Sequence, residues 1–555
     1  MRFSLPSKPW LQFLLFFGVL LVVLVLVRGS VLWTSGMQNP DEAELMAEGR
    51  SAAENLFPYS NYTTSTHLFL WPFLLGLLGL VGVPLTLVTA HIIGGLTYVL
   101  LGTTGWFLTM RRIGGVRAAL LVLPTTLVLL LGYGPGTSDF LSMTSEALPV
   151  VVLCVAALVM LGPDHPMTNR QLVVGALVAG LSVWTKPQSG PVAAAFVGAC
   201  VLMACVENQR SPGVASPTGT VPRVVRSLAL AALAFVTPTV VLLGVMWLGG
   251  TLDELVREPL ASMWGYAAHR DESQGVVAPP LTDRLSGLAS FVSSFPFALA
   301  WALGGLLSMT FLARLESRLL RTLGLAAFLL PLAATLICLL PIYPLFPHYA
   351  TFLYVGCMLA TCVAVRLAVP EQGDITGARW VEGTYGAVSL VAVAMLMLPV
   401  VPDQVEDLAH ESGRALTGHG FSFNNEIPRT ATRLGVICPA DSRVLVWGWA
   451  SELYAYYDWS PASRYANATW LIYPNDRQTE YGSILDGELR QDPPDCIVEA
   501  LGPAFFAGID PAYGLATIVP RVSSLLESCY TATDEKTFDD RAVRLYHLKP
   551  TCPSG

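Results

Sequence analysis

The sequence contains few charged residues, and this scarcity excludes most classes of soluble protein. Only 13% of its 555 residues are charged, whereas 53% are hydrophobic. Its formal net charge is −8 and no basic stripe is visible, so we expect no nucleic-acid partner. Lysine occurs only at Lys8, Lys186, Lys536 and Lys549. This composition predicts an integral membrane protein that is surrounded by a lipid bilayer.

Cysteine spacings that would bind zinc are also missing. No CxxC motif or Cys/His spacing occurs among the 10 cysteines, so we expect no zinc site. Six cysteines lie in apolar segments, where they should pack as small hydrophobic residues: Cys154, Cys200, Cys205, Cys338, Cys357 and Cys362. Four lie in the polar C-terminal part and permit disulfides in three connectivities: Cys438, Cys496, Cys529 and Cys552.

Long hydrophobic runs are abundant. A membrane-spanning helix needs about 17–25 mostly apolar residues, and the sequence predicts about eleven such spans. They lie near residues 9–27, 86–110, 117–133, 147–162, 171–185, 188–206, 227–248, 293–313, 322–340, 348–366 and 384–401. The first run follows Arg2 and Lys8 and lacks a cleavage site, so it predicts a retained anchor with a cytoplasmic N-terminus. An odd number of spans then places the C-terminus outside.

One further apolar block, "THLFLWPFLLGLLGLVGVP", is interpreted as a re-entrant or interfacial helix. If it crossed the bilayer, every later helix would be inverted. When it does not cross, the arginine-rich loops gather on the cytoplasmic side, as the distribution of Lys and Arg in membrane proteins requires. Pro72 also makes the block a poor straight helix.

The fold class we predict is a mainly α polytopic membrane protein with a small C-terminal α/β extracytoplasmic domain. Residues 1–402 form the transmembrane domain and residues 403–555 the soluble domain. In the soluble part, "RVLVWGW", "SRYAN", "DCIVEA" and "AVRLYHLK" indicate strands, whereas "SELYAYYD" and residues 477–490 and 519–529 indicate helices. Strands that alternate with helices favour a small α/β layer.

Acidic residues follow the first span directly, in "NPDEAELMAEG". Asn39, Pro40 and Glu42 have the spacing of a capping box with proline at the first helical position, so Asp41 and Glu42 could simply begin an interfacial helix. A second acidic stretch on the same side, "GYGPGTSDFLSMTSE", contains Asp139 and Glu146. Two acidic loops at one membrane face suit general-base chemistry on a hydroxyl group, or a cation site. Helix capping is the alternative for Glu146 as well.

Positive charge is rare on this side of the predicted membrane. Lys186 lies between two short spans and could be a snorkelling anchor or a phosphate ligand. His348 and Tyr349 lie where a helix re-enters, and they could be interfacial residues or could bind an anion. Arg270 belongs to a long loop that mixes aromatic and charged residues.

These motifs resemble the GT-C superfamily of polyprenyl-phosphate-sugar-dependent glycosyltransferases, which includes protein O-mannosyltransferases and the lipid A aminoarabinose transferase. The resemblance is carried by "DEAELMAEGRSAAENLFPY" after the first span, the apolar "HLFLWPFLLGLLGLVG", a span ending in "RR", an outer loop ending in an acid, and "FPHYATFLYVGCMLA". The segment from "VLVWGWASELYAYYDWSPASRY" to "PPDCIV" is similar to the C-terminal domain of some bacterial members. The layout covers most of the chain.

The resemblance implies that Asp41 is the catalytic base, with Glu42 beside it, and that Glu146 is the acid of the second outer loop. Asp139 is expected to contact the acceptor or to serve as a secondary acid. Many members have Lys-Pro before the interfacial helix, but this chain has Thr66 and His67 there. We therefore expect donor-phosphate binding by Lys186, His348 and Tyr349, with His67 or Arg270 as further candidates.

The expected function is an inverting, single-displacement transfer of a sugar from a polyprenyl-phosphate donor to a hydroxyl group of a glycan, lipid or protein acceptor. The resemblance implies a multi-pass protein of the bacterial inner membrane, with its C-terminal domain in the periplasm. No cofactor is required, although the carboxylates could hold Mg²⁺ or Mn²⁺.

Three alternatives remain open at this point. A flippase or transporter of a lipid-linked sugar would usually place polar residues mid-membrane and show repeats, and neither is visible. A polysaccharide polymerase or ligase that uses a polyprenyl diphosphate would rely on the loop at residues 250–290. A receptor or scaffold would leave the two acidic loops explained only as helix caps.

Overall fold

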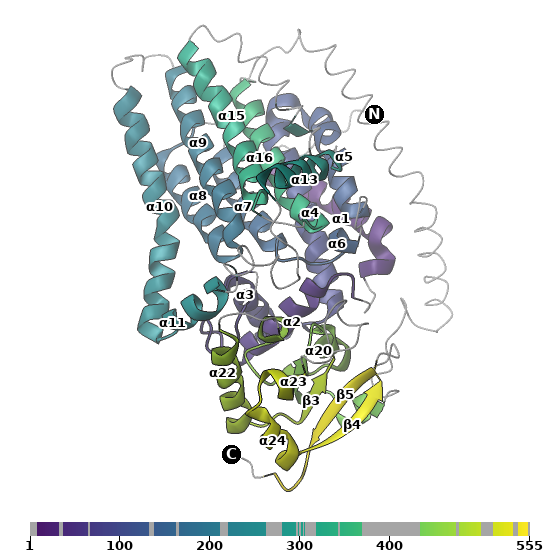
Figure 1. Ribbon diagram of the computed structural model, residues 1–555. Helices are drawn as coiled ribbons and strands as arrows, with labels where there is room; N and C mark the ends of the chain where they lie inside the picture. The colour runs from purple at the N-terminus through teal and green to yellow at the C-terminus, as the bar shows by residue number, and fades with distance from the viewer. Residues whose placement is uncertain are drawn as a thin grey trace, which may run out of the picture. The chain divides into compact units, whose positions relative to one another are not determined.

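The structure, a computed structural model, consists of two compact units (Figure 1). It describes residues 8–32, 37–64, 67–132, 138–162, 166–210, 220–261, 263, 280–295, 298, 301–302, 305, 318–341, 345–368, 433–472, 477–500, 514–536 and 542–552. The helical unit comprises Met1–Leu32, Ile92–Gly244 and Pro279–Gly413. The α/β unit comprises Trp33–His91, Val245–Ala278 and Arg414–Gly555. The predicted boundary between residues 402 and 403 lies outside the described residues and stays a prediction.

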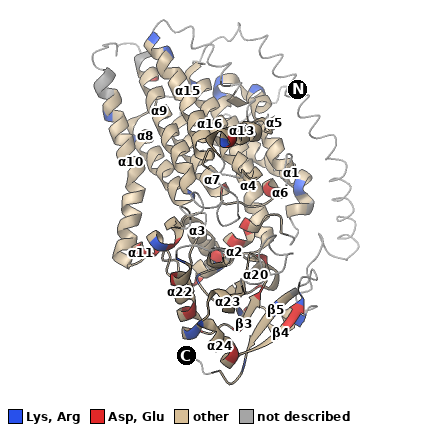
Figure 2. Ribbon diagram, in the orientation of Figure 1, with Lys and Arg blue, Asp and Glu red and all other residues tan. Residues whose placement is uncertain are grey.

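The helical unit is built from apolar helices with mainly terminal charges (Figure 2). Its elements are α1 (Pro9–Leu32), α4 (Leu87–Ile113), α5 (Gly115–Leu131), α6 (Ser138–Leu141), α7 (Ala147–Leu161), α8 (Asn169–Leu181), η1 (Ser182–Trp184), η2 (Pro187–Ser189), α9 (Gly190–Arg210), α10 (Thr220–Gly249), α13 (Leu281–Ser293), α15 (Arg318–Leu339), η6 (Pro347–Tyr349) and α16 (Ala350–Ala368). Within the described residues, 6 helices are long and apolar enough to cross a membrane. The chain is therefore an integral membrane protein.

The central helix α16 and the peripheral helix α10 differ in how much of their apolar stretch is buried. The apolar stretch of α16 is 100% buried, whereas only 11% of the corresponding stretch of α10 is buried. An apolar helix that stays exposed in this way faces lipid, because lipid tails replace the protein contacts. The central α16 packs against α7, α9 and α15 and so carries η6, at its N-terminal end, into the interior.

Most of the predicted spans coincide with helices. The expected spans from 9–27 to 227–248, together with those at 322–340 and 348–366, each overlap a helix. Two of these helices, α7 with 15 residues and α8 with 13, are shorter than the expected length of a spanning helix, and α5, with 17, is at its lower limit. Most of the expected span at 293–313 and all of that at 384–401 lie outside the described residues.

The apolar block after residue 66 forms the short helix α3 (Leu70–Leu80). With 11 residues it is too short to cross a bilayer, which agrees with the interfacial or re-entrant interpretation. It packs against α2 (Pro40–Glu54), and at Gly76 a Cβ atom would come within 2.9–3.0 Å of Ala52. This glycine therefore allows the two helices to approach closely.

The α/β unit contains a mixed sheet of five strands in the order β2-β1-β3-β5-β4. Its strands are β1 (Arg443–Trp447), β2 (Ser460–Pro461), β3 (Cys496–Glu499), β4 (Tyr530–Lys536) and β5 (Ala542–Leu548). Strands β2, β1 and β3 are parallel, and β5 and β4 are added in antiparallel orientation. Its other helices are α11 (Leu252–Leu255), η4 (Val256–Leu260), α19 (Arg433–Ile437), α20 (Glu452–Tyr457), α21 (Thr469–Ile472), α22 (Gln478–Gln491), α23 (Leu515–Ile518) and α24 (Val522–Cys529). The predicted small α/β domain is confirmed.

One predicted strand of this unit is wrong, and one observed strand was not predicted. "SRYAN" is not a strand; the short β2 lies just before it, at Ser460–Pro461. Strand β4 was missed because its sequence, "YTATDEK", is polar and it lies at the edge of the sheet. The tyrosines of α20 are buried and belong to the core of this unit.

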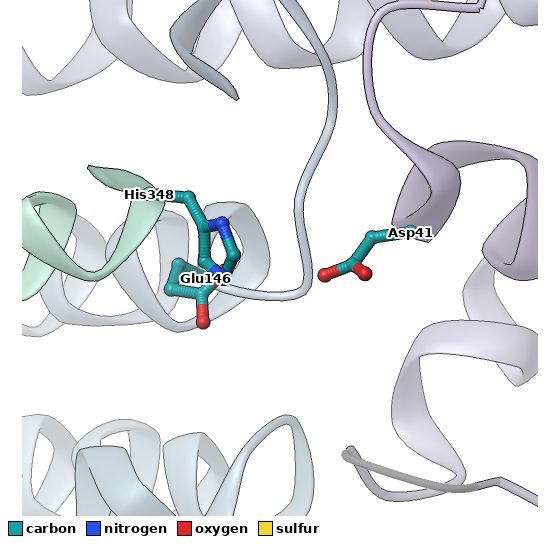
Figure 3. Close-up of side chains that lie close together, drawn as sticks. All are labelled: Asp41, Glu146 and His348. Atoms are coloured by element: carbon teal, nitrogen blue, oxygen red, sulfur yellow. The ribbon is translucent and has the colours of Figure 1, made fainter. Parts of the chain in front are cut away.

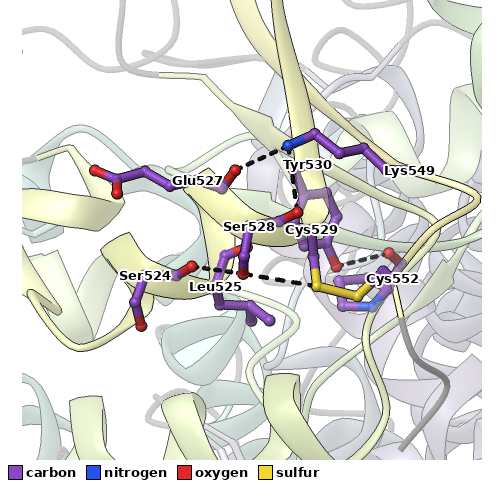
Figure 4. Close-up of a disulfide and its surroundings, with 9 residues drawn as sticks. Ser524, Leu525, Glu527, Ser528, Cys529, Tyr530, Lys549 and Cys552 are labelled. Atoms are coloured by element: carbon purple, nitrogen blue, oxygen red, sulfur yellow. Dashed lines mark hydrogen bonds between the residues drawn. A yellow bond between two sulfur atoms is a disulfide. The ribbon is translucent and has the colours of Figure 1, made fainter.

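The four cysteines of the C-terminal part form two disulfides, Cys438–Cys496 and Cys529–Cys552. The first joins the segment before β1 to the start of β3, and the second joins the end of α24 to the C-terminal segment. Beside the second, Lys549 donates hydrogen bonds to the carbonyl oxygens of Glu527 and Ser528 (Figure 4). The six cysteines of the apolar segments are buried thiols, as predicted.

Candidate active site

Helix α2 begins with the local structure that the sequence indicates. The side chain of Asn39 accepts a hydrogen bond from the backbone N–H of Asp41 at 2.8 Å, and the Glu42 carboxylate accepts from the N–H of Asn39 at 3.4 Å. Together with Pro40 these contacts form a capping box. Asp41 therefore projects from a fixed first turn (Figure 3). The capping explanation is correct for Asn39 and Glu42, but it assigns no role to the Asp41 carboxylate.

Two further acids of α2 are buried within the α/β unit. Glu44 Oε2 accepts a hydrogen bond from Asn467 Nδ2 at 2.9 Å, and Glu48 Oε2 lies 2.6 Å from His67 Nε2. Burial raises the pKa of Glu48 well above its usual range, and the nearby Asp41 carboxylate raises it further. The raised pKa favours the protonated form of Glu48, which lies against the imidazole of His67.

A small polar cavity lies beside these acids. Its volume of about 20 Å³ is enough for about one water molecule. It is lined by Glu44, Glu48, Thr63, Thr64, Glu258, Tyr465, Ala466, Asn467, Leu471 and Tyr481. Two pairs of these residues bond to each other: Asn467 donates to Glu44 at 2.9 Å, and Tyr465 donates to Glu258 at 2.9 Å. The cavity thus belongs to a buried hydrogen-bond network that supports α2.

In the helical unit, the acid of the second loop is paired with a lysine. Lys186 Nζ contacts the Glu146 carboxylate and donates to Ser145 Oγ at 2.6 Å. Glu146 and Lys186 are 0% and 1% exposed, and Lys186 Nζ also lies 5.1 Å from the ring centroid of Tyr349. The snorkelling interpretation of Lys186 is therefore wrong. Glu146 makes no side-chain capping bond to α7, so the capping interpretation fails for it too.

A second pair in the helical unit joins Asp139 to His348. The Asp139 carboxylate accepts from His348 Nδ1 at 3.0 Å and from the backbone N–H of His348 at 3.3 Å. The imidazole ring also stacks on Phe346, and Figure 3 shows it beside Glu146. Asp139 therefore fixes both the orientation of the ring and the proton on Nδ1.

Together these pairs place two basic side chains in one buried part of the helical unit. Lys186 lies between η1 and η2, and His348 lies in η6 at the start of α16, so packing of short 3₁₀ segments holds both in place. Fixed positive charge in a dry site stabilises negative charge that develops on a leaving group. The arrangement can therefore stabilise a departing phosphate.

The other predicted site residues have different surroundings. His67 belongs to the α/β unit, where Glu48 engages its Nε2 atom. Arg270 lies outside the described residues. Asp41 belongs to the α/β unit and Glu146 to the helical unit, so their predicted convergence stays a prediction.

Two residues that contact the predicted site residues were not predicted from the sequence, Ser145 and His91. Ser145 receives a hydrogen bond from Lys186, and nothing in the "TSE" motif distinguished it from a helix cap. His91 lies 3.2 Å from Glu42 and is 0% exposed. Its signal was available, because it is one of only 8 histidines and it interrupts the apolar start of a predicted span.

No protein-family model matches the chain, and no curated protein matches its sequence. Among solved structures, ArnT from Cupriavidus metallidurans bound to undecaprenyl phosphate is similar, with a TM-score of 0.52 and 15% identity over 98% of this chain and 99% of that chain. The chain shares the ArnT fold. ArnT in the apo state gives a TM-score of 0.49 at 15% identity over 95% of this chain and 98% of that chain. The first likeness confirms the predicted fold class, a mainly helical membrane protein with a small α/β domain.

Proposed function

We propose that the protein is a glycosyltransferase that moves a sugar from a polyprenyl-phosphate donor to an acceptor hydroxyl group on the extracytoplasmic face. The buried Glu146–Lys186 pair carries the proposal, because it holds a cation in a membrane unit where an isolated charge would be costly. The shared fold supports it, since ArnT was crystallised with undecaprenyl phosphate.

The proposed reaction is a single displacement with inversion at the anomeric carbon. The acceptor oxygen forms a bond to that carbon while the bond from carbon to phosphate oxygen breaks, and Asp41 removes the hydroxyl proton. The electron pair of the broken bond leaves with the polyprenyl phosphate, whose charge Lys186 and His348 stabilise. Glu146 holds Lys186 in place, and the mechanism requires Asp41 to approach this part of the helical unit.

The proposed reaction needs no metal ion, because a phosphate monoester leaves with less charge than a diphosphate. Glu146 and His348 could nevertheless ligate Mg²⁺ or Mn²⁺, since carboxylate oxygen suits both ions and imidazole is acceptable to Mn²⁺. We expect transfer to continue after EDTA treatment. A loss of transfer that MnCl₂ restores would assign a catalytic cation instead.

The substitution Asp41→Asn tests the proposal directly. Base catalysis typically contributes about 10²- to 10⁴-fold, so we expect turnover to fall by about that factor while the folded protein is retained. Mass spectrometry of envelope glycans, with and without the gene, identifies the product. Release of polyprenyl phosphate from polyprenyl-phosphate mannose, glucose and arabinose by protein reconstituted in liposomes then gives the rate.

The matched control is Asp441→Asn, at an exposed position where φ is +67°. Asparagine tolerates this backbone conformation, so the control should behave as the wild type does. Normal turnover of Asp41→Asn would eliminate the proposed base. The same assay also includes diphosphate-linked donors. Transfer from these donors would indicate a polymerase or ligase reaction, whereas transfer only from polyprenyl-phosphate sugars supports the proposal.

A further inference from the structure

The first turn of α2 is fixed from outside the helix by a histidine. Glu42 Oε1 accepts hydrogen bonds from the backbone N–H groups of Gln38 at 2.6 Å and Asn39 at 3.4 Å. The same oxygen lies 3.2 Å from His91 Nε2. Glu42 and His91 are both 0% exposed. Both belong to the α/β unit, which includes the first residues of α4 up to His91. His91 thus connects the start of α4 to the turn that presents Asp41.

This arrangement is more costly than a helix cap needs to be. Glu42 already completes the capping box through backbone N–H groups. Beyond that, Glu42 Oε2 and His91 Nδ1 are buried without a hydrogen-bond partner among the described residues. Each such atom lowers the stability of the fold, because it has lost its hydrogen bonds to water and gained none in the protein. A leucine at position 91 would avoid the cost of the buried His91 Nδ1 atom, so stability alone does not explain the histidine.

We propose that His91 is a positioning residue for Asp41 and acts through Glu42. Asp41 is the residue immediately before Glu42, and its own N–H is bound by Asn39 at 2.8 Å. The contact with His91 therefore fixes the side chain of Glu42, the third residue of α2. The proposed base, Asp41, is the second residue of the same turn. A displacement of about 1 Å in a catalytic group can cost about 10²-fold in rate. Glu42, which the sequence suggested as catalytic, is then a positioning residue as well.

This inference rests on the proposed function, and substitutions at position 91 test it. The amide nitrogen of glutamine can reach the place of histidine Nε2, whereas the shorter asparagine reaches only the place of Nδ1. We expect His91→Gln to keep most of the turnover. We expect His91→Asn and His91→Leu to lower kcat by about 10- to 100-fold with little change in KM. His547→Leu, at an exposed position of β5, is the matched control.

The liposome assay with polyprenyl-phosphate sugars measures kcat and KM, and thermal unfolding of the same detergent-purified variants measures stability. A purely structural role predicts that turnover and Tm fall together. We expect turnover to fall while the Tm of His91→Leu is kept or raised, because an unpartnered polar atom is removed. If His91→Leu does not fold, the comparison of His91→Gln with His91→Asn decides.

Two results would overturn the inference. One is normal kcat in His91→Asn or His91→Leu. The other is a loss in His91→Gln as large as that in His91→Asn. Either result, combined with an inactive Asp41→Asn, would leave the proposed function intact. Normal turnover of Asp41→Asn would instead remove the proposed function itself.

Discussion

Buried carboxylates are stabilised differently in the two units. In the helical unit Glu146 is paired with Lys186, and Glu207 with Arg366 at 2.7 Å. In the α/β unit Glu42 binds backbone N–H groups and His91, and Glu48 contacts His67 Nε2 at 2.6 Å. Lysine or arginine therefore pairs with Glu146 and Glu207 of the helical unit, whereas histidine or backbone N–H groups pair with Glu42 and Glu48 of α2. Asp139 is an exception in the helical unit, because it pairs with His348.

The difference has a physical cause. Within a membrane no water solvates an isolated charge, so a buried carboxylate needs a counter-charge close by. At the start of a helix, unpaired N–H groups and the helix dipole already favour a carboxylate. Glu42, in the first turn of α2, therefore needs no lysine or arginine. The contrast suits a division of roles in which one unit supplies a base and the other supplies positive charge for the leaving group.

The largest effect on stability should come from breaking the Glu146–Lys186 pair. In Lys186→Met the fully buried Glu146 loses its counter-charge, which should lower the free energy of unfolding by about 3–5 kcal/mol. Thermal unfolding of the detergent-solubilised protein measures the loss. The double variant Lys186→Met/Glu146→Leu should regain most of it, because no unpaired charge remains.

The exposed Asp534–Arg544 pair of the α/β unit is the control for that comparison. Arg544→Met should change stability by only about 0–1 kcal/mol. Equal losses in Arg544→Met and Lys186→Met would show that the buried pair is no more important to the fold than a surface pair.

A somewhat smaller effect should follow from removing the disulfides. We expect Cys438→Ala/Cys496→Ala to cost about 2–5 kcal/mol, and Cys529→Ala/Cys552→Ala to cost about 1 kcal/mol less. The reason is that the first bond closes a sequence separation of 58 residues and the second one of 23. Unfolding of each double variant measures the cost, and mass spectrometry of unreduced peptides checks the connectivity.

Reduction provides the matching test on the helical unit, whose described cysteines are buried thiols. The difference in unfolding between Cys200→Ala and the wild type should therefore be the same with and without dithiothreitol, because Cys200 forms no disulfide. A different disulfide pattern in the peptides would contradict the connectivity.

The smallest effect concerns Glu48. Because its pKa is raised in the folded protein, the folded state binds this proton more tightly than the unfolded chain does. The resulting stability is fully present below the ordinary carboxyl range and is lost as pH rises through the raised pKa. Glu48→Gln resembles the protonated acid, so we expect its unfolding temperature to depend less on pH than that of the wild type.

The exposed Glu480→Gln serves as the control for Glu48 and should leave the pH dependence of the wild type unchanged. If Glu48→Gln followed the wild-type pH curve as well, the raised pKa of Glu48 would be wrong.

Much of the fold could be predicted from the sequence, because the signals are local. The apolar runs specified α1, α4, α9 and α16, and Asn39 with Glu42 specified the start of α2. Strand β4 escaped because a polar edge strand lacks hydrophobic alternation, and "SRYAN" misled because its aromatic residue packs in a loop. The sequence showed which acidic and basic residues were candidates for the site, but it did not show which of them pair with each other.

Local sequence signals were enough to predict that the chain enters a membrane, where most of its described apolar helices lie and how α2 begins, since each depends on residues within a few turns of one another. Only the tertiary structure decided that Glu146 meets Lys186, that Asp139 holds His348 across 209 positions, and that His91 supports the turn of Asp41. Pairing between distant residues depends on how helices pack and on the cost of leaving a charge unpaired, and neither can be read from local spacing.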